Sequence, residues 1–413
     1  MRRTLVVLGG ADGSLGVYLR ARELGYHTIC VDVRPNAPGA AVADEYLQLS
    51  VRAPERIDAA LGERTDIVGV LCPASDVGLP TQAWLERRWN LPSPLPEAAV
   101  AASVDKPVFR AVCERAGVPT YRSATASSIP ELLDAARHMR FPALVKPVDS
   151  SGSRGVVSCA NPGKLASAVA ESLEFSFSGR VVVEEHLDGR HLTIEALVVD
   201  GEIAFHAVTA RTITPPPLFV TTAHEMPVDL PGKTADALPG MLAAVAAELR
   251  YRNGPLTFDA VLQRDDELYL IEVGARMGGN GIAEVVRHCH GVDLMAATMS
   301  LAVGEVPVLD PHPPVPALVH ILASDRAGLL AEIDGLAEVR AMPEVKDLHL
   351  FVTEGSFVRP YEQAGYKLGY VVLSAESTSA LWSVENAVRG TLKFRLDTGN
   401  ASPAANDVAV PKP

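Results

Sequence analysis

Short apolar runs rich in β-branched residues alternate with stretches of helical pattern in the N-terminal part of the chain. The runs are TLVVLGG (4–10), YHTICVDV (26–33) and DIVGVLCP (66–73). Strands separated by helical stretches in this way indicate an open parallel α/β sheet. We therefore expect a Rossmann-like domain over residues 1–95.

The next region mixes strands and helices in a different order. Residues 106–117 (KPVFRAVCERAG) have the pattern of a helix, with Asp105 before it as the N-cap and Gly117 at its end. Further apolar runs predict strands at 141–148, 155–160, 181–187 and 192–210. We expect an α+β domain over residues 96–310.

The segment PHPPVP, which follows Asp310, marks another boundary. Beyond it, ALVHILAS, KDLHLFV and YKLGYVVLSAES predict the strands of a smaller α+β domain over residues 311–396. The tail 397–413 is polar and contains prolines, which predicts disorder. The expected fold class is α/β and α+β in several domains.

Composition narrows the class of partner and the compartment. The 413 residues include 48% hydrophobic and 21% charged residues, with a formal net charge of -13. This charge argues against nucleic acid and anionic membranes as partners. The first apolar run stops at Gly9, too early for a secretion signal, and no run is long enough to span a bilayer. Five scattered cysteines without a CxxC pair indicate reduced thiols, and hence a cytoplasmic protein.

The stretch LTFDAVLQRDDELYLIEVGARMGGNG (256–281) predicts two apolar strands joined by a short acidic turn. Each strand has a carboxylate where an apolar residue is expected, Asp259 and Glu272. A two-residue turn at 265–266 places them opposite each other. Like charges across a strand pair are destabilising unless something lies between them, and carboxylates suit Mg²⁺. We expect both residues to bind this metal.

Two further patterns point to a phosphate ligand. Lys146 lies inside an apolar strand, and the loop SSGSRGV (150–156) follows it. The backbone N–H groups of such a loop can bind phosphate oxygens, although a hairpin turn with a lysine reaching solvent explains the pattern equally well. The carboxylate pair favours the phosphate site. Arg276, in the turn after Glu272, can then neutralise charge that develops on an acyl or phosphoryl oxygen.

Three other motifs are weaker. The glycines of GGADGSLG, with Asp32 at the end of the next strand, resemble a dinucleotide site but lack the GxGxxG spacing. The segment PGKT (231–234) lacks the first glycine of a Walker loop, since position 227 is proline. His288 and His290 are two residues apart on a predicted helix and point to different faces, so a structural role is expected rather than a metal site.

Taken in order, several of these motifs resemble the ATP-grasp superfamily, whose members join a carboxylate to a nucleophile through an acyl-phosphate. The motifs are Lys106, Lys146, SSGSRGV, EEHL (184–187), FDAVL (258–262) and IEVGAR (271–276). The resemblance covers roughly residues 1–390. With His224 and the segment GYKLGYVV, the chain looks most like bacterial L-amino acid α-ligases. The resemblance implies an ATP-grasp fold, with a lid subdomain at about 122–188, between the N-terminal Rossmann-like domain and the C-terminal α+β domain.

The resemblance also implies a role for individual residues. Asp259 and Glu272 would bind Mg²⁺, Arg276 would stabilise the acyl-phosphate, and His224 would lie at the amino-acid site. A further set of residues would bind ATP: Lys106, Lys146, Ser150, Ser151, Gly152, Gly155, Glu184, Glu185, Leu187, His191 and Leu262. Of these, Glu184, Glu185 and Leu187 would line the adenine region, with Leu262 beneath the base.

Two positions depart from the family pattern. Where members have a ribose-binding glutamate, this chain has His191, so Glu195 or water would have to substitute. Where members have an asparagine metal ligand, it has Gly274.

The leading hypothesis is an ATP-dependent carboxylate–amine ligase acting on amino acids or similar small molecules, in the cytoplasm, with a homodimer as the default assembly. Carboxylation or formylation of a purine precursor is the first alternative. A Rossmann-type NAD(P) oxidoreductase and a silent nucleotide-binding protein are the others. For His224, a purely structural role is the alternative to a substrate contact.

Overall fold

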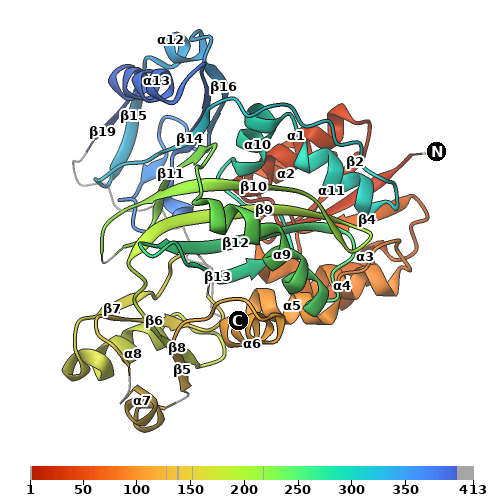
Figure 1. The fold of residues 1–413 in the computed structure, drawn as a ribbon. Coiled ribbons are helices and arrows are strands. Elements are labelled where there is room, and N and C mark those ends of the chain that lie inside the picture. Colours follow the sequence, from red (N-terminus) through yellow and green to blue (C-terminus); the bar gives the residue numbers. More distant parts are fainter. Residues whose placement is uncertain (1, 127, 137–138, 151, 217, 398–413) are drawn as a thin grey trace.

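The computed structural model describes residues 2–126, 128–136, 139–150, 152–216 and 218–397 (Figure 1). The predicted tail lies almost entirely outside the described residues. No helix in the described ranges combines the length and apolar character needed to cross a membrane.

The N-terminal region is built on a four-stranded parallel sheet of order β3-β2-β1-β4, as the sequence predicts (Figure 1). Its strands are β1 (Thr4–Leu8), β2 (His27–Val31), β3 (Glu45–Leu47) and β4 (Ile67–Leu71), and its helices are α1 (Leu15–Glu23), α2 (Pro38–Val42), α3 (Pro54–Leu61) and α4 (Leu79–Arg88). Strand β3 was not predicted, because its three half-buried residues have no apolar run.

The loop after β1 is held by Asp32 rather than left open for a dinucleotide. One carboxylate oxygen of Asp32 accepts a hydrogen bond from the Gly10 backbone N at 2.9 Å, and the other accepts one from the Arg34 backbone N at 2.9 Å. The Arg34 guanidinium also pairs with this carboxylate at 3.0 Å. These contacts give GGADGSLG and Asp32 a structural role.

The central feature is an eight-stranded sheet of order β13-β12-β9-β10-β11-β14-β18-β16. Its strands are β9 (Gly189–Val199), β10 (Glu202–Ile213), β11 (Thr221–Met226), β12 (Gly254–Gln263), β13 (Leu268–Gly274), β14 (Ala317–Leu322), β16 (Val345–Leu350) and β18 (Gly369–Ser374). The sheet therefore runs without a break through the predicted boundary near residue 310.

Helices and two smaller sheets complete the molecule. The region expected to be a lid, called the lid below (yellow in Figure 1), has the sheet order β5-β8-β6-β7, and the C-terminal region (blue) adds the order β17-β15-β19. The lid strands are β5 (Ser123–Ala126), β6 (Ala143–Pro147), β7 (Val157–Cys159) and β8 (Val181–Glu185); the C-terminal strands are β15 (Gly328–Asp334), β17 (Phe357–Val358) and β19 (Lys393–Asp397). The remaining helices are α5 (Glu97–Val104), α6 (Lys106–Ala116), α7 (Ile129–Ala135), α8 (Leu165–Leu173), α9 (Gly232–Glu248), α10 (Ile282–His290), α11 (Leu294–Ala302), α12 (Leu336–Arg340) and α13 (Thr378–Thr391).

Helix α6 begins and ends as its sequence predicts. The side chain of Asp105 accepts a hydrogen bond from the Val108 backbone N at 3.2 Å, and Gly117 closes the helix in the left-handed conformation with φ of 68°. A side-chain acceptor for the first free N–H groups and a glycine after the last turn are the usual helix limits. The cap places Lys106, the first residue of α6, beside strand β13.

The histidines of α10 contact different partners, which confirms the structural interpretation. His288 Nε2 lies 2.9 Å from a carboxylate oxygen of Asp347, whereas the His290 ring packs edge-on against Phe205 with centroids 5.7 Å apart. In the described ranges, no group of three or more His, Cys, Asp or Glu side chains could hold a metal.

Candidate active site

Polar side chains lie next to one another on one face of the large sheet, across β13, β12, β9, β10 and β11. The strand register pairs Glu272 with Asp259, Asp259 with Thr193, and Thr193 with Thr209; it also pairs Arg211 with His224. On the opposite face, alternate residues of β9 and β12 such as Ile194 and Phe258 belong to the main core. Because side chains alternate along each strand, one face of the sheet is polar and the other is apolar; we call the first the polar face.

The pairing of Asp259 with Glu272 is confirmed, but the predicted turn is wrong. Gln263, not Arg264, faces Glu267, since its N–H donates to the Glu267 carbonyl at 2.9 Å, and residues 264–266 form the turn. A β-bulge between Asp259 and Ala260 then shifts the register by one residue. The longer turn and the bulge cancel, so the two carboxylates still face each other.

The two carboxylates are accessible and electrostatically unequal. The side chain of Asp259 is 26% exposed and that of Glu272 is 38% exposed. Burial raises the pKa of Asp259, but an ion pair with the Arg211 guanidinium outweighs it and lowers that pKa. The pKa of Glu272 is raised by desolvation and by the charges of Asp259 and Asp76, although Lys106 Nζ lies 3.7 Å away. A divalent cation between the two acids would remove this repulsion.

Lys106 connects the carboxylate pair with the glycine-containing loop. Its Nζ donates to the Ser150 carbonyl at 2.7 Å, so α6 and the loop meet at this amine. Gly152 and Gly155 have φ of 67° and 74°, a conformation open to glycine. The Ser150 hydroxyl is buried without a hydrogen-bond partner among the described residues, which exclude Ser151. A phosphate oxygen would satisfy it.

The predicted adenine region is partly rearranged. Leu187 packs with Tyr121 and Val261 in a small cluster, and the Glu185 carboxylate accepts from the Arg122 backbone N at 2.8 Å. The prediction that Leu262 lies beneath the base is wrong. Leu262 is the next residue along β12 and points into the main core on the other face. Val261, not Leu262, lies on the same face as Asp259.

Glu184 does not extend toward an open nucleotide site. Its side chain is 2% exposed and accepts a hydrogen bond from Lys146 Nζ at 2.7 Å. Arg110 lies on the other side of the same carboxylate, with Nη2 3.1 Å from Oε1. Lys146 therefore has a fixed anionic partner, which the sequence did not indicate.

His191 and Glu195, the residue that would substitute for the ribose-binding glutamate, both lie on β9 but have different surroundings. His191 lies opposite Val261, and burial together with the Arg211 charge lowers its pKa to about 4. Glu195 accepts hydrogen bonds from Thr257 Oγ1 at 2.5 Å and from the Gly278 backbone N at 3.0 Å. Burial raises its pKa to about 7. Glu195 thus supports the loop that contains Arg276.

Arg276 is oriented by an acid from the N-terminal region. Its Nε and Nη2 donate to the two carboxylate oxygens of Asp76, each at 2.9 Å. Asp76 begins a 3₁₀ turn (Asp76–Gly78) beyond the carboxyl end of β4. A Cβ atom on Gly274 would come within 2.9 Å of Asp76 Oδ1. The glycine that replaces the usual asparagine therefore makes room for this ion pair.

His224 lies in strand β11. Its side chain is only 2% exposed, and its Nδ1 lies 3.0 Å from Thr209 Oγ1. Burial, with Arg211 nearby, lowers its pKa to about 3, so the ring is neutral. These contacts favour the structural alternative for His224.

The sequence analysis did not identify three charged residues of the site, although the sequence pattern gave a signal for each. Asp76 follows a parallel strand, at the edge where such sheets bind ligands. Arg211 interrupts the apolar pattern of β10, and Arg110 lies on the buried face of α6. A charged residue in a buried position needs a partner, and this need was the available signal.

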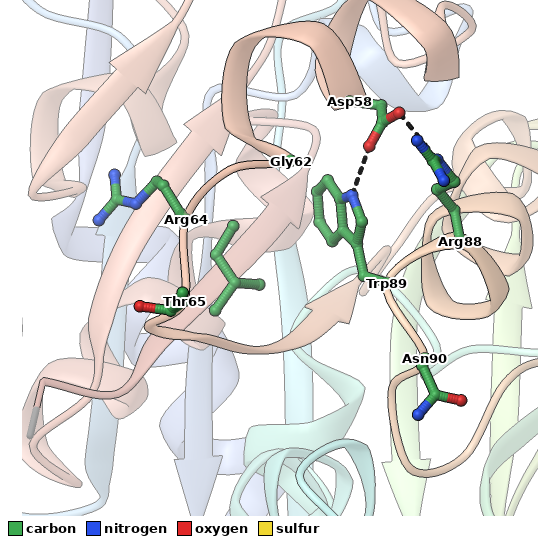
Figure 2. A pocket seen from close by; sticks show the side chains of 8 residues that line it. Asp58, Gly62, Arg64, Thr65, Arg88, Trp89 and Asn90 are labelled. Atoms are coloured by element: carbon green, nitrogen blue, oxygen red, sulfur yellow. Dashed lines mark hydrogen bonds and ion pairs between the residues drawn. The ribbon is translucent and has the colours of Figure 1, made fainter.

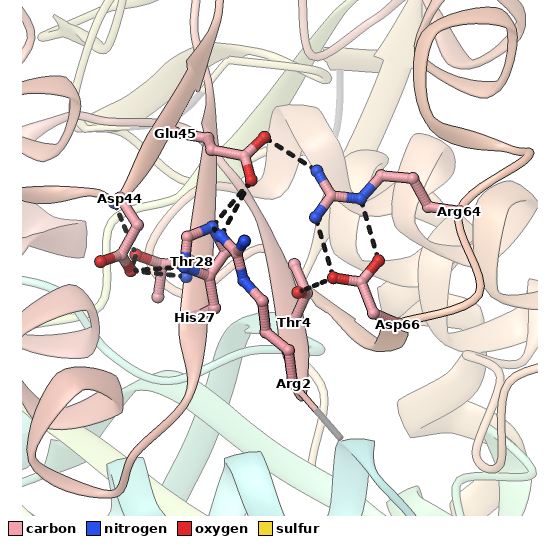
Figure 3. A network of polar contacts seen from close by, with 8 residues as sticks. All are labelled: Arg2, Thr4, His27, Thr28, Asp44, Glu45, Arg64 and Asp66. Carbon is pink, nitrogen blue, oxygen red and sulfur yellow. Dashed lines mark hydrogen bonds and ion pairs between the residues drawn. The ribbon is translucent and has the colours of Figure 1, made fainter.

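A separate hollow of about 380 Å³ lies at the amino end of β4, opposite the end that precedes Asp76 (Figure 2). Asp58 accepts from Trp89 Nε1 at 2.7 Å and from Arg88 Nε at 3.0 Å. Arg64 is neutralised by Asp66 and Glu45 in the adjoining polar network of the same sheet (Figure 3). With both arginines paired, this hollow does not resemble an anion site.

Comparisons with known proteins agree with this geometry. Residues 139–284 match the ATP-grasp domain family, and residues 320–397 match the L-amino acid ligase C-terminal domain 2. The uncharacterized protein y4rH of Sinorhizobium fredii is 30% identical over 397 residues, which cover 92% of this chain and 80% of that protein. The formate-dependent phosphoribosylglycinamide formyltransferase of Mycolicibacterium smegmatis is 32% identical over 219 residues, 49% of this chain and 53% of that enzyme.

Among solved structures, the L-amino acid ligase from Bacillus licheniformis superposes with a TM-score of 0.79 at 21% identity, covering 96% of this chain and 99% of that one. The chain belongs to the ATP-grasp enzymes. It is a carboxylate–amine ligase of this family, whose members use ATP with Mg²⁺. The predicted fold, enzyme class and cofactors are confirmed.

Proposed function

We propose that this enzyme joins two amino acids, or closely similar molecules, by an amide bond, with release of ADP and phosphate. The match of residues 320–397 to the L-amino acid ligase C-terminal domain is the single observation that favours amino acids. Three strands of that region, β14, β16 and β18, belong to the same sheet as the polar face. The matching domain is therefore continuous with the candidate site.

The side chains present fit the expected metal and nucleotide. Asp259 and Glu272 would hold Mg²⁺, which offsets the negative charge of the phosphates during phosphoryl transfer. The buried hydroxyl of Ser150 and the buried Nε of Arg211 have no hydrogen-bond partner among the described residues, and both suit phosphate oxygens. ATP supplies the phosphoryl group that activates the substrate carboxylate as an acyl-phosphate.

The chain's own residues would then bind the phosphates, orient the reacting groups and exclude water. Lys106 and Lys146 would bind phosphate oxygens, and the amine of Lys106 would keep the loop at Ser150 closed over them. Arg276, fixed by Asp76, would stabilise the negative charge on the acyl oxygen as the amine attacks. Closure matters because an acyl-phosphate open to water hydrolyses before it meets the amine.

The decisive experiment is a phosphate-release screen of the full chain with ATP, Mg²⁺ and pairs of amino acids, followed by mass spectrometry of the product. We expect release that requires both amino acids, together with a product equal in mass to the two less one water. ATP binding without release for any amino-acid pair would contradict the proposal.

Formyl transfer to a ribonucleotide is the second candidate, because relatives with that name align with half of the chain. The same assay distinguishes it when formate and phosphoribosylglycinamide replace the amino acids. Release that depends on formate, and not on amino acids, would favour this alternative.

A further inference from the structure

Glu184, at the end of β8, is a buried carboxylate with partners on both oxygens. Its Oε2 accepts from Lys146 Nζ at 2.7 Å. Its Oε1 accepts from Arg110 Nη2 and from the Tyr121 hydroxyl, each at 3.1 Å. With 2% of the side chain exposed, the carboxylate depends on these contacts, since an isolated buried charge is strongly unfavourable.

Arg110 is held so that it cannot turn toward a ligand. Its Nη1 donates to the Tyr121 carbonyl at 2.5 Å, and its guanidinium carbon lies 3.4 Å from the centre of the Tyr121 ring. Only 10% of the side chain is exposed. A guanidinium bound to a carbonyl, an aromatic face and a carboxylate has little freedom left.

The balance of charge around Glu184 determines what Lys146 can do. Lys146 and Glu184 alone would form a neutral pair, with little net attraction for a phosphate. With Arg110 on the other oxygen, and with Lys106 also acting on this carboxylate from farther away, the cations outnumber the anion and a positive charge remains. The pKa of Glu184 is lowered despite burial, which by itself raises it, because Lys146 and then Arg110 outweigh desolvation.

We propose that Arg110 is a positioning residue that neutralises Glu184 and so leaves the charge of Lys146 available to the phosphates of the nucleotide. The inference rests on the role proposed above for Lys146. It assigns no ligand contact to Arg110, which acts only through Glu184.

The test is a double-mutant cycle on ATP affinity, measured by calorimetry on the full chain with Mg²⁺ and no amino acid. We expect Arg110→Met to weaken ATP binding roughly tenfold, the scale of one charged interaction. Arg110→Lys, which keeps the charge, should stay within about threefold of the wild type. In the Glu184→Gln background, Arg110→Met should change affinity by less than about threefold, since no anion remains to be neutralised.

Arg115→Met is the matched control, because Arg115 is on the same helix α6 but pairs with Glu248 at the surface at 2.8 Å. It should leave ATP affinity unchanged. If Arg110→Met folds poorly, Arg110→Gln replaces it in both backgrounds, so that the affinities of all four proteins of the cycle can be measured.

A purely structural role for Arg110 predicts the opposite result. Arg110→Met would then weaken ATP binding as much in the Glu184→Gln background as in the wild type, so that the two losses add. Wild-type affinity in Arg110→Met, or an equal loss in both backgrounds, would overturn the inference. Failure of the amino-acid screen would leave this binding result unaffected, so the two proposals are tested separately.

Discussion

At the scale of single residues, the candidate site consists of cations paired with acids from other elements. The pairs are Arg211 with Asp259, Lys106 with Glu272, Lys146 with Glu184, and Arg276 with Asp76. Each pair fixes two side chains at once and keeps the region close to electrical balance.

The carboxylate pair gives the most direct prediction. Glu272→Gln and Asp259→Asn should each reduce phosphate release roughly a hundredfold or more, because each removes a charge needed to hold Mg²⁺. The measurement is a coupled phosphate assay, with circular dichroism to confirm folding. Glu267→Gln, directly after the turn of the same hairpin, should retain wild-type turnover. Near-normal rates in the Glu272 or Asp259 variant would show that the metal lies elsewhere.

Asp76 gives a second prediction at this scale. Asp76→Asn keeps the shape of the side chain but removes the charge that holds Arg276 in a two-point contact. We expect kcat to fall roughly tenfold or more with little change in the KM for ATP. Asp58→Asn is the control, since Asp58 pairs with Arg88 in the same region but beyond the other end of β4. Equal effects of both variants would contradict a specific role for Asp76.

At the scale of elements, local geometry decides which side chains meet. The bulge in the β12–β13 hairpin restores a pairing that the longer turn would have shifted by one residue. The loop 150–155 depends on glycines in the left-handed conformation between the lysine strand β6 and strand β7. Small backbone features therefore determine whether the charges of the site converge.

Gly155→Ala adds only a methyl group, but it should disturb the conformation of the loop. Besides the unfavourable φ, the new Cβ would come within 2.7 Å of the Phe175 Cβ and 2.8 Å of Pro147. Gly117 also has a positive φ, but a Cβ added there would meet no atom within 4 Å, so Gly117→Ala is the matched control. We expect a severalfold higher KM for ATP only in Gly155→Ala, whereas Gly117→Ala should cost about 1 kcal/mol of stability alone.

At the scale of the whole molecule, three regions meet around the polar face. The N-terminal region contributes Asp76, the helix α6 and the lid contribute the lysines, and the C-terminal strands extend the sheet (Figure 1). Contacts of this kind tie the stability of the regions together. Stability of the entire chain is therefore a sensitive measure of buried groups at their junctions.

Glu86, on α4, is such a group. It is 4% exposed, accepts from the Leu95 backbone N and from Gln82 Nε2 at 2.7 Å each, and burial raises its pKa from 4.5 to about 7. The fold thus favours the protonated form. The stability linked to this proton is fully present below about pH 4.5 and is lost as the pH rises through about 7.

Glu86→Gln should mimic the protonated form. Compared with the wild type, we expect a higher free energy of unfolding at about pH 8.5, by up to roughly 3 kcal/mol, and little difference at about pH 5. Urea unfolding at the two pH values measures this. Glu97→Gln, at an 88% exposed position, should show no such dependence on pH. A difference that is the same at both pH values would rule out titration of Glu86 as the cause.

The sequence by itself determined the elements and the family, because both depend on local information. Hydrophobic period, the cap at Asp105 and the ordered motifs from Lys106 to Arg276 are all properties of short segments. They were sufficient to predict the parallel sheet, the facing acids Asp259 and Glu272, and the ATP-grasp fold.

Only the tertiary structure decided which charges neutralise which. Asp76 binds Arg276 across 200 positions, and Arg110 binds Glu184 across 74. It also decided that Val261 and Leu262 lie on opposite faces of β12, and that His224 is buried and neutral. The physical reason is that an ion pair between distant segments depends on distance in space and on exclusion of water, and neither is encoded by spacing along the chain.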